Sequence, residues 1–150
     1  MTLEERLDAD LKDAMRSGDT TRKLAIRAVK TAITEAKVAG TEVKTLSDAD
    51  VLAIITKQVK QRRDSIIEYT KGGRPDLAVQ EQAEIAVLEV YLPQQLSEAE
   101  IRERAQAVIA ELGVTDMKGF GSVMKRLSAD LRGIADGQII NRVVRELLGG

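Results

Sequence analysis

One stretch, residues 47–74, constrains the fold more than any other part of the chain. It opens at Ser47, a favourable helix N-cap, and closes at Gly72-Gly73, which can supply the left-handed residue that stops a helix. Between these points one apolar row recurs at helical spacing: Val51, Ile55, Val59, Ile66 and Tyr69. The pattern predicts a single helix of about 24 residues, roughly 36 Å long at 1.5 Å per residue.

The next helix is predicted from Pro75 to about Val90, because proline is favoured at the first helical position. The short turn over residues 72–75 then makes an antiparallel helical hairpin. Arg62 falls on the apolar row of the first helix, where an unpaired charge is costly. We therefore predict structural ion pairs inside the hairpin, with solvated surface charge as the alternative. The predicted pairs join Arg62 and Arg63 to Glu81 and Glu84.

The rest of the chain indicates an all-α fold. It has two prolines and three aromatic residues, and no window alternates with the period of a strand. Caps and glycines predict four helices before Pro93 and three after it, with the second helix ending at Gly40. We expect an N-terminal four-helix bundle with a long hairpin over residues 1–93, followed by a C-terminal three-helix subdomain over residues 97–150.

The chain contains no cysteine and no histidine. Thiol catalysis, disulfides, imidazole bases and Cys/His zinc sites are therefore excluded. The start of the chain is acidic and unlike a signal peptide, and no apolar run approaches 18 residues. The lack of cysteine favours the cytosol, so we expect a cytoplasmic protein.

Other candidate chemistry is weak. The glycines of residues 119–121 and 133–137 follow no strand and match no phosphate loop, so helix capping explains them better. Ser65 and Ser122 have no histidine to activate them. We predict no catalytic residue, no metal site and no cofactor.

Basic residues form the remaining signal, on a chain whose net charge is only −1. Clusters of basic residues at helical spacing are explained either by solvated helix faces or by binding to an anionic partner. We favour binding to an anionic partner. Structured RNA suits such a surface better than a base-specific duplex reader, because RNA helices are bound mostly through shape, phosphates and 2′-hydroxyls. The predicted nucleic-acid-binding residues are Lys57, Lys60, Arg63 and Lys71, with Arg126, Arg132, Arg142 and Arg145 as a second patch.

A family resemblance extends over nearly the whole chain. It is carried by the stretches 60–66, 73–78 and 91–97, by single positions that include Tyr69 and Glu81, and by residues 121–124 and 133–137. These residues resemble the YqeY family, stand-alone homologues of the tail of the aspartyl/glutamyl-tRNA amidotransferase B subunit, GatB. One departure is Ile134, where the family turn usually carries arginine.

The resemblance implies two helical subdomains and a role beside tRNA. In the full amidotransferase the tail meets the tRNA body, while other parts carry the carbon–nitrogen ligase activity that uses glutamine as amido donor. This chain resembles only the tail, so we expect a non-catalytic module that binds tRNA or a tRNA–protein complex. We do not expect it to bind a membrane. Two alternatives stay open: a protein adaptor that docks on an amidotransferase subunit or another translation component, and an accessory that influences amidotransferase catalysis.

Overall fold

The computed structural model describes residues 1–150 as seven α-helices and one short 3-10 helix, without a strand. The all-α prediction is confirmed. The chain divides into two compact units, Met1–Leu92 and Pro93–Gly150, and each is described by itself.

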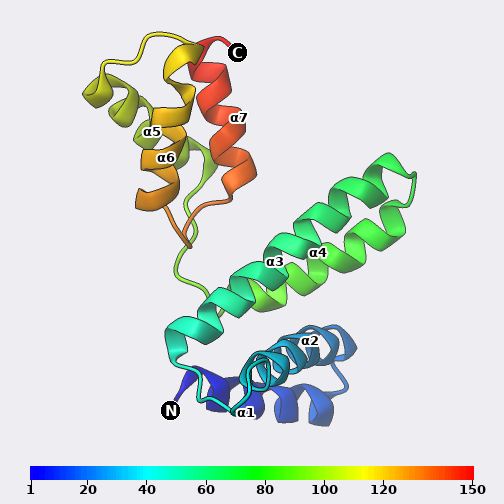
Figure 1. The fold of residues 1–150 in the computed structure, drawn as a ribbon. Helices are drawn as coiled ribbons and strands as arrows, with labels where there is room; N and C mark the ends of the chain where they lie inside the picture. Colours follow the sequence, from blue (N-terminus) through cyan, green and yellow to red (C-terminus); the bar gives the residue numbers. More distant parts are fainter. The chain divides into compact units, whose positions relative to one another are not determined.

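The first unit contains four helices, with the fourth doubling back along the third (Figure 1). Their bounds are α1 (Leu3–Ser17), α2 (Thr20–Lys37), α3 (Asp48–Lys71) and α4 (Pro75–Glu89). The side chains of Thr2, Asp19 and Ser47 each accept a hydrogen bond from a backbone N–H three residues further on, which starts the first three helices. The second helix stops at Lys37 rather than at Gly40.

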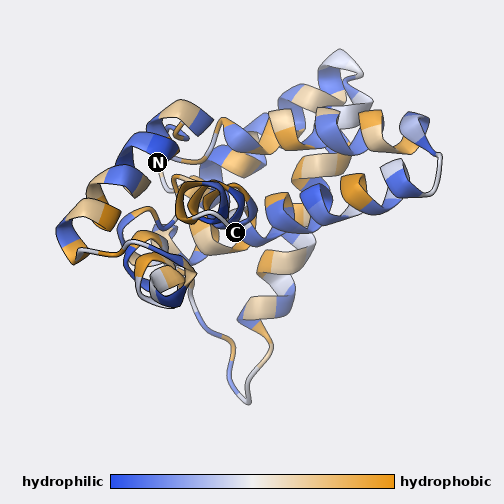
Figure 2. Cartoon of the chain, turned by 90° about the horizontal axis from the view of Figure 1, so that it is seen from above, coloured by the Kyte–Doolittle hydropathy of each residue, from blue (hydrophilic) through white to orange (hydrophobic).

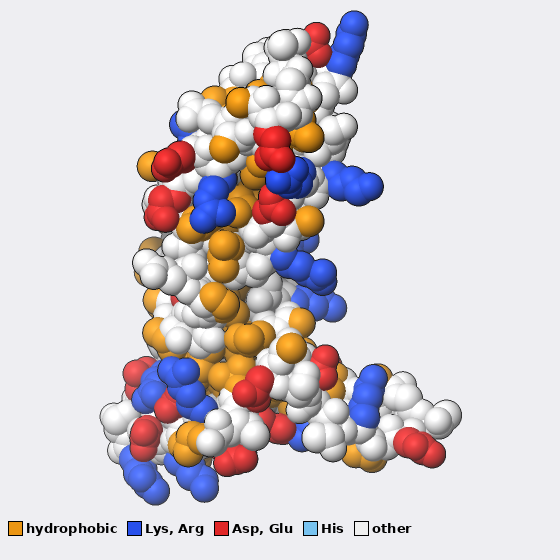
Figure 3. All heavy atoms as spheres, turned by 90° about the vertical axis from the view of Figure 1, so that its left-hand side faces the viewer, with side chains coloured by type: hydrophobic (Ala, Val, Ile, Leu, Met, Phe, Trp, Pro, Cys, Tyr) orange, Lys and Arg blue, Asp and Glu red, His pale blue; other side chains and the backbone are white.

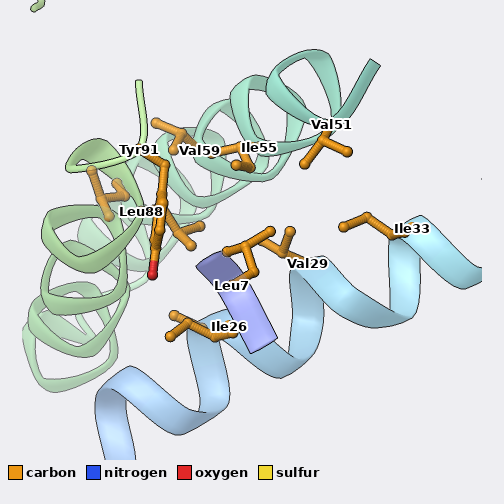
Figure 4. Packing of buried hydrophobic residues seen from close by; sticks show 11 residues of the cluster. Leu7, Ile26, Val29, Ile33, Val51, Ile55, Val59, Leu88 and Tyr91 are labelled. Atoms are coloured by element: carbon orange, nitrogen blue, oxygen red, sulfur yellow. The ribbon is translucent and has the colours of Figure 1, made fainter. Parts of the chain in front are cut away.

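The core of this unit lies where α1 and α2 pack against the hairpin. Leu7 of α1, Ile26 and Val29 of α2 and Ile55 of α3 are fully buried and point toward one another (Figure 4). Burying side chains of this size stabilises the fold by about 1.5–3 kcal/mol each. The four helices therefore form one unit around a shared apolar centre.

The hairpin of α3 and α4 has a buried base and an exposed tip. Core residues end at Arg62 on α3 and resume at Ile85 on α4, and no side chain from 63 to 84 is fully buried. Gly73 has a φ of 71° and allows the left-handed turn at the tip. The tip thus depends on contacts between its two helices, and it extends away from α1 and α2 (Figure 1).

The second unit packs three helices and a short turn around its own core. Its elements are α5 (Glu98–Leu112), η1 (Met117–Gly119), α6 (Phe120–Asp130) and α7 (Gly137–Leu148). Hydrophobic and hydrophilic residues alternate around the helices (Figure 2), and the inward rows supply buried residues such as Ile101, Leu127 and Val143. At Gly119 a Cβ would come within 2.3 Å of Val114, so only glycine fits that contact.

Candidate nucleic-acid interface

Three of the predicted RNA-binding residues lie along one solvent-facing side of α3. Lys57, Lys60 and Lys71 are exposed, and none of them forms an ion pair. Together they span about 21 Å of the helix axis at 1.5 Å per residue. We call these three side chains the lysine row. Each is a mobile point charge that can meet a phosphate without a fixed geometry.

Two acidic residues interrupt the lysine row. Asp64 and Glu68 are exposed on the same side of α3, between Lys60 and Lys71. The row therefore carries a net charge near +1, and its positive potential is concentrated at Lys57 and Lys60. A phosphate would meet this end of the row with the least repulsion.

Arg62, on the opposite face of α3, is nearly buried and serves the fold. Its side chain is 11% exposed, and Nη2 lies 3.3 Å from an oxygen of Glu84, whose side chain is 14% exposed. Nη1 donates to the backbone carbonyl of Gln58 at 3.1 Å and to its side-chain oxygen at 2.8 Å. Nε has no partner. The pair closes the buried base of the hairpin, where removing either charge would leave the other uncompensated.

Arg63 has a different partner from the one predicted. Its Nη2 lies 2.9 Å from an oxygen of Glu89, five residues further from the tip than Glu84. Helical side chains tilt toward the N-terminus of their own helix. In an antiparallel hairpin, Arg63 therefore reaches toward the C-terminal end of α4. Arg63 is half-buried and held by this pair, which makes it a poor candidate for binding RNA.

Glu81 forms no ion pair, although it was predicted to do so. Desolvation is the main cause that raises its pKa, the charge of neighbouring Glu84 raises it further, and Arg62 lowers it in part. Arg62 is committed to Glu84, so Glu81 bears a net electrostatic cost when ionised. The predicted cluster is thus reduced to one close pair with a second carboxylate beside it.

Two of the four arginines predicted as a patch in the second unit are neutralised by acidic side chains. Arg126 lies 3.1 Å from Glu111 and 2.9 Å from Asp130. Arg142 pairs with Glu98 at 2.5 Å. On the face drawn in Figure 3, several acidic side chains lie next to basic ones. Both arginines offer little uncompensated charge to a phosphate.

The other two arginines of that patch differ from each other. Arg145 donates to Asn141 at 2.8 Å and stacks over the Phe120 ring at 4.8 Å from its centroid. Arg132 is exposed and forms no ion pair. Arg132 and Arg145 thus both lack an acidic partner, but only Arg132 is not held by a neighbouring side chain.

Two groups of charged contacts in the first unit were not predicted. Lys30 and Lys37 of α2 pair with Asp8 and Glu4 of α1. These pairs give the acidic composition of α1 and the basic composition of α2 a structural reason, because the opposite charges face each other where the two helices pack. The sequence showed the asymmetry, but it did not show that the charges meet.

The second unpredicted group surrounds Tyr91, which follows α4. Its hydroxyl donates to Asp10 of α1, and Arg22 lies 3.3 Å from the same carboxylate. The guanidinium of Arg6 stacks over the Tyr91 ring. Burial is the main cause that raises the pKa of Tyr91, and the hydrogen bond to Asp10 adds to it. These contacts join α1, α2 and the end of α4, and leave the Tyr91 ring unavailable for stacking on a base.

The structure shows how one of the two serines considered for chemistry is engaged. The hydroxyl of Ser65 donates to the backbone carbonyl of Gln61 at 3.0 Å in the middle of α3. No three acidic side chains converge closely enough to hold a metal ion. None of the helices combines the length and apolar composition needed to cross a bilayer.

Comparisons with known proteins found one matching family and several similar proteins. The sequence profile of a family described as "Yqey-like protein" matches residues 4–148. The chain is 32% identical to "Altered inheritance of mitochondria protein 41, mitochondrial" of Pyrenophora tritici-repentis, over 96% of this chain and 80% of that protein. It is 35% identical to the protein of the same name in Lachancea thermotolerans, over 71% of this chain and 57% of that protein. The protein of that name in Kluyveromyces lactis is also 35% identical, over 75% and 58% respectively.

These relatives correct one prediction. The absence of cysteine favoured a cytoplasmic location, but the similar proteins are named as mitochondrial. Cysteine content reports only on the redox conditions that a chain must tolerate, and it could not distinguish these compartments. The chain spans little more than half the length of the second and third relatives, so nothing about the activity of those whole proteins follows directly for this chain.

Proposed function

The chain belongs to the Yqey-like protein family, and we propose that it is a non-catalytic module that binds tRNA through phosphate contacts. The observation that carries the proposal is the lysine row, three exposed cations without ion pairs on one side of α3. Arg132 of the second unit is a further candidate contact. Binding of this kind depends on charge and position rather than on base sequence.

The aromatic residues support phosphate binding over base stacking. Tyr91 is buried against Asp10, and Phe120 lies beneath Arg145. Tyr69 is half-buried in the hairpin. Proteins that hold single strands by stacking need exposed rings. A structured RNA, bound along its backbone, is therefore the better match.

The choice of tRNA rests on the resemblance to the tail of the tRNA amidotransferase B subunit. The names of the curated relatives mention no RNA. The chain has no histidine or cysteine, and its serines lack an activating base. We therefore attribute the carbon–nitrogen ligase chemistry of the amidotransferase to that larger assembly and not to this chain.

The test is binding of bulk tRNA by the full chain, measured by filter retention at low salt. A variant in which Lys57, Lys60 and Lys71 are changed to glutamine should bind at least about tenfold more weakly, the loss expected from removing several phosphate contacts. The matched control changes Lys12, Lys23 and Lys44 to glutamine, three lysines of the same unit that also lack ion pairs.

The control separates a localised interface from a general attraction. Equal losses in the two variants would contradict a site on α3. Absence of tRNA binding by the wild-type chain, together with capture of an amidotransferase subunit, would instead favour the adaptor alternative.

A further inference from the structure

Helix α4 carries apolar residues on two opposite faces. Ile85 and Leu88 on the inner face are buried against α3 and α2. On the outer face, Val79 is 69% exposed, and Val90, the C-cap residue that continues the helical backbone beyond Glu89, is 64% exposed. Ordinary surface helices have a single apolar row, so the outer row requires a separate explanation. Nothing in the proposed RNA contact uses it, because the lysine row lies on α3.

The outer row has the spacing of a helix–helix seam. Its members are Val79, Ala83, Ala86 and Val90, separated by four, three and four residues. Intervals of four and three are those of the two core positions of a coiled coil. Ala86 is exposed and Ala83 is half-buried. Alanines at the centre of such a row let a second helix approach closely, within the range of about 8–10 Å between axes.

The row is also symmetric about its own midpoint, between residues 84 and 85. An identical helix packed antiparallel on this row would place Val79 against Val90 of the second copy, and Ala83 against Ala86. A two-fold contact requires this reciprocity, since each residue must meet its counterpart in both directions. We therefore propose that a second copy of this chain packs antiparallel on the outer face of α4.

The charges of α4 are compatible with this contact. The helix has four acidic residues and no basic one, which would disfavour self-association if the acids faced outward. Glu84 and Glu89 are instead held by Arg62 and Arg63 on the hairpin side, and Asp76 is held by Arg74. The outer row is uncharged, and its neighbours Gln80 and Gln82 are neutral. The fourth acid, Glu81, has no ion pair, but it is half-buried on the hairpin side near Arg62 and Glu84. Like-charge repulsion across the outer row is therefore small.

The expected dimer is weak. A single helical row buries less than the roughly 1,200 Å² of a standard stable interface. Sedimentation equilibrium of the full chain without RNA, from about 10 µM to about 1 mM, should show a monomer–dimer equilibrium. A chain that stays monomeric across this range would overturn the proposal.

The register can be tested by charge exchange. Val79→Glu and Val90→Lys should each raise the dimer dissociation constant at least about tenfold, because each buries an ion against a valine. The double variant V79E/V90K places each new glutamate opposite a new lysine, and its dissociation constant should return to within about threefold of wild type. Both positions are mostly exposed in the monomer, so the variants should remain folded.

The matched control is Val43→Glu, an equivalent change at a valine that is 77% exposed between α2 and α3. It should leave the dissociation constant unchanged. Equal weakening by Val43→Glu and Val79→Glu would contradict a contact on α4. Weakened single variants without recovery in the double variant would contradict the antiparallel register.

Discussion

Two faces of α3 use positive charge in different ways. On the inner face, Arg62 is nearly buried and is neutralised by Glu84 of α4. On the outer face, Lys57, Lys60 and Lys71 stand in solvent without ion pairs. Both faces carry basic residues over this stretch, yet only the outer cations lack an acidic partner. The number of basic residues therefore says less about binding than the number that lack an acidic neighbour.

The second unit extends the same lesson. Its predicted patch has as many basic residues as the predicted set on α3, but Arg126 and Arg142 each pair with an acid. Exposed ion pairs of this kind contribute little to stability. They do cancel the field that would draw in a phosphate. The first unit is accordingly the better candidate for the main RNA contact.

The largest effect should come from the inner face. Changing Arg62 to Met leaves Glu84 nearly buried without a counter-charge, which should lower the free energy of unfolding by about 3 kcal/mol. The double variant R62M/E84L removes both charges and should recover most of the loss. Urea denaturation measures the free energy of unfolding of both variants. The control Lys60→Met, on the outer face, should change stability by less than about 0.5 kcal/mol.

A second effect should appear on the outer face of α3, where removing acidic residues should strengthen binding to tRNA. Changing Asp64 and Glu68 to Asn and Gln removes the two acids that interrupt the lysine row. The affinity for tRNA should rise by about threefold to tenfold, because a phosphate then meets less repulsion. Filter retention at one fixed salt concentration would show it. An unchanged affinity would mean that RNA does not follow this side of α3.

A smaller effect is expected from the second unit. Removing both Arg126 and Glu111, as R126Q/E111Q, leaves the net charge unchanged and deletes a neutralised pair. The affinity for tRNA should change by less than about twofold. A loss as large as that from the lysine row would mean that Arg126 leaves its acidic partners to bind RNA.

The smallest effect concerns pH. The pKa of Glu81 is raised, chiefly by desolvation, so the folded state binds its proton more tightly than the unfolded state does. The resulting penalty is absent below the unfolded pKa of about 4.3 and sets in as the pH rises through the folded pKa. Glu81→Gln should therefore raise Tm by about 1 °C at pH 7. Thermal unfolding at pH 4 should show no such gain.

Local features of the fold could be predicted from the sequence because they depend on neighbours along the chain. Ser47 starts α3 as the N-cap expected from the sequence, and the structure completes it into a capping box with Asp50. The glycine turn before Pro75 determines which parts of α3 and α4 face each other, so Glu84 could be expected near Arg62. These predictions required only helical geometry and a short connection.

Other contacts could not be predicted because they depend on how separate helices are positioned. The choice of Glu89 by Arg63 depends on side-chain tilt across the hairpin. The pairing of Arg126 with Glu111 depends on how α5 and α6 pack. Neither contact leaves a signal in spacing alone. The sequence could therefore predict which residues are basic, but it could not predict which of them stay unpaired.

The most direct test of the account is the salt dependence of tRNA binding. If the lysine row provides the contact, a plot of the logarithm of the binding constant against the logarithm of salt concentration should have a slope of about −2 to −3. The variant with Lys57, Lys60 and Lys71 changed to glutamine should reduce that slope to about −1 or less in magnitude, the share that Arg132 could supply, while R126Q/E111Q should leave it unchanged. A slope that is unchanged in the lysine variant would contradict the claim that unpaired cations on α3 form the interface.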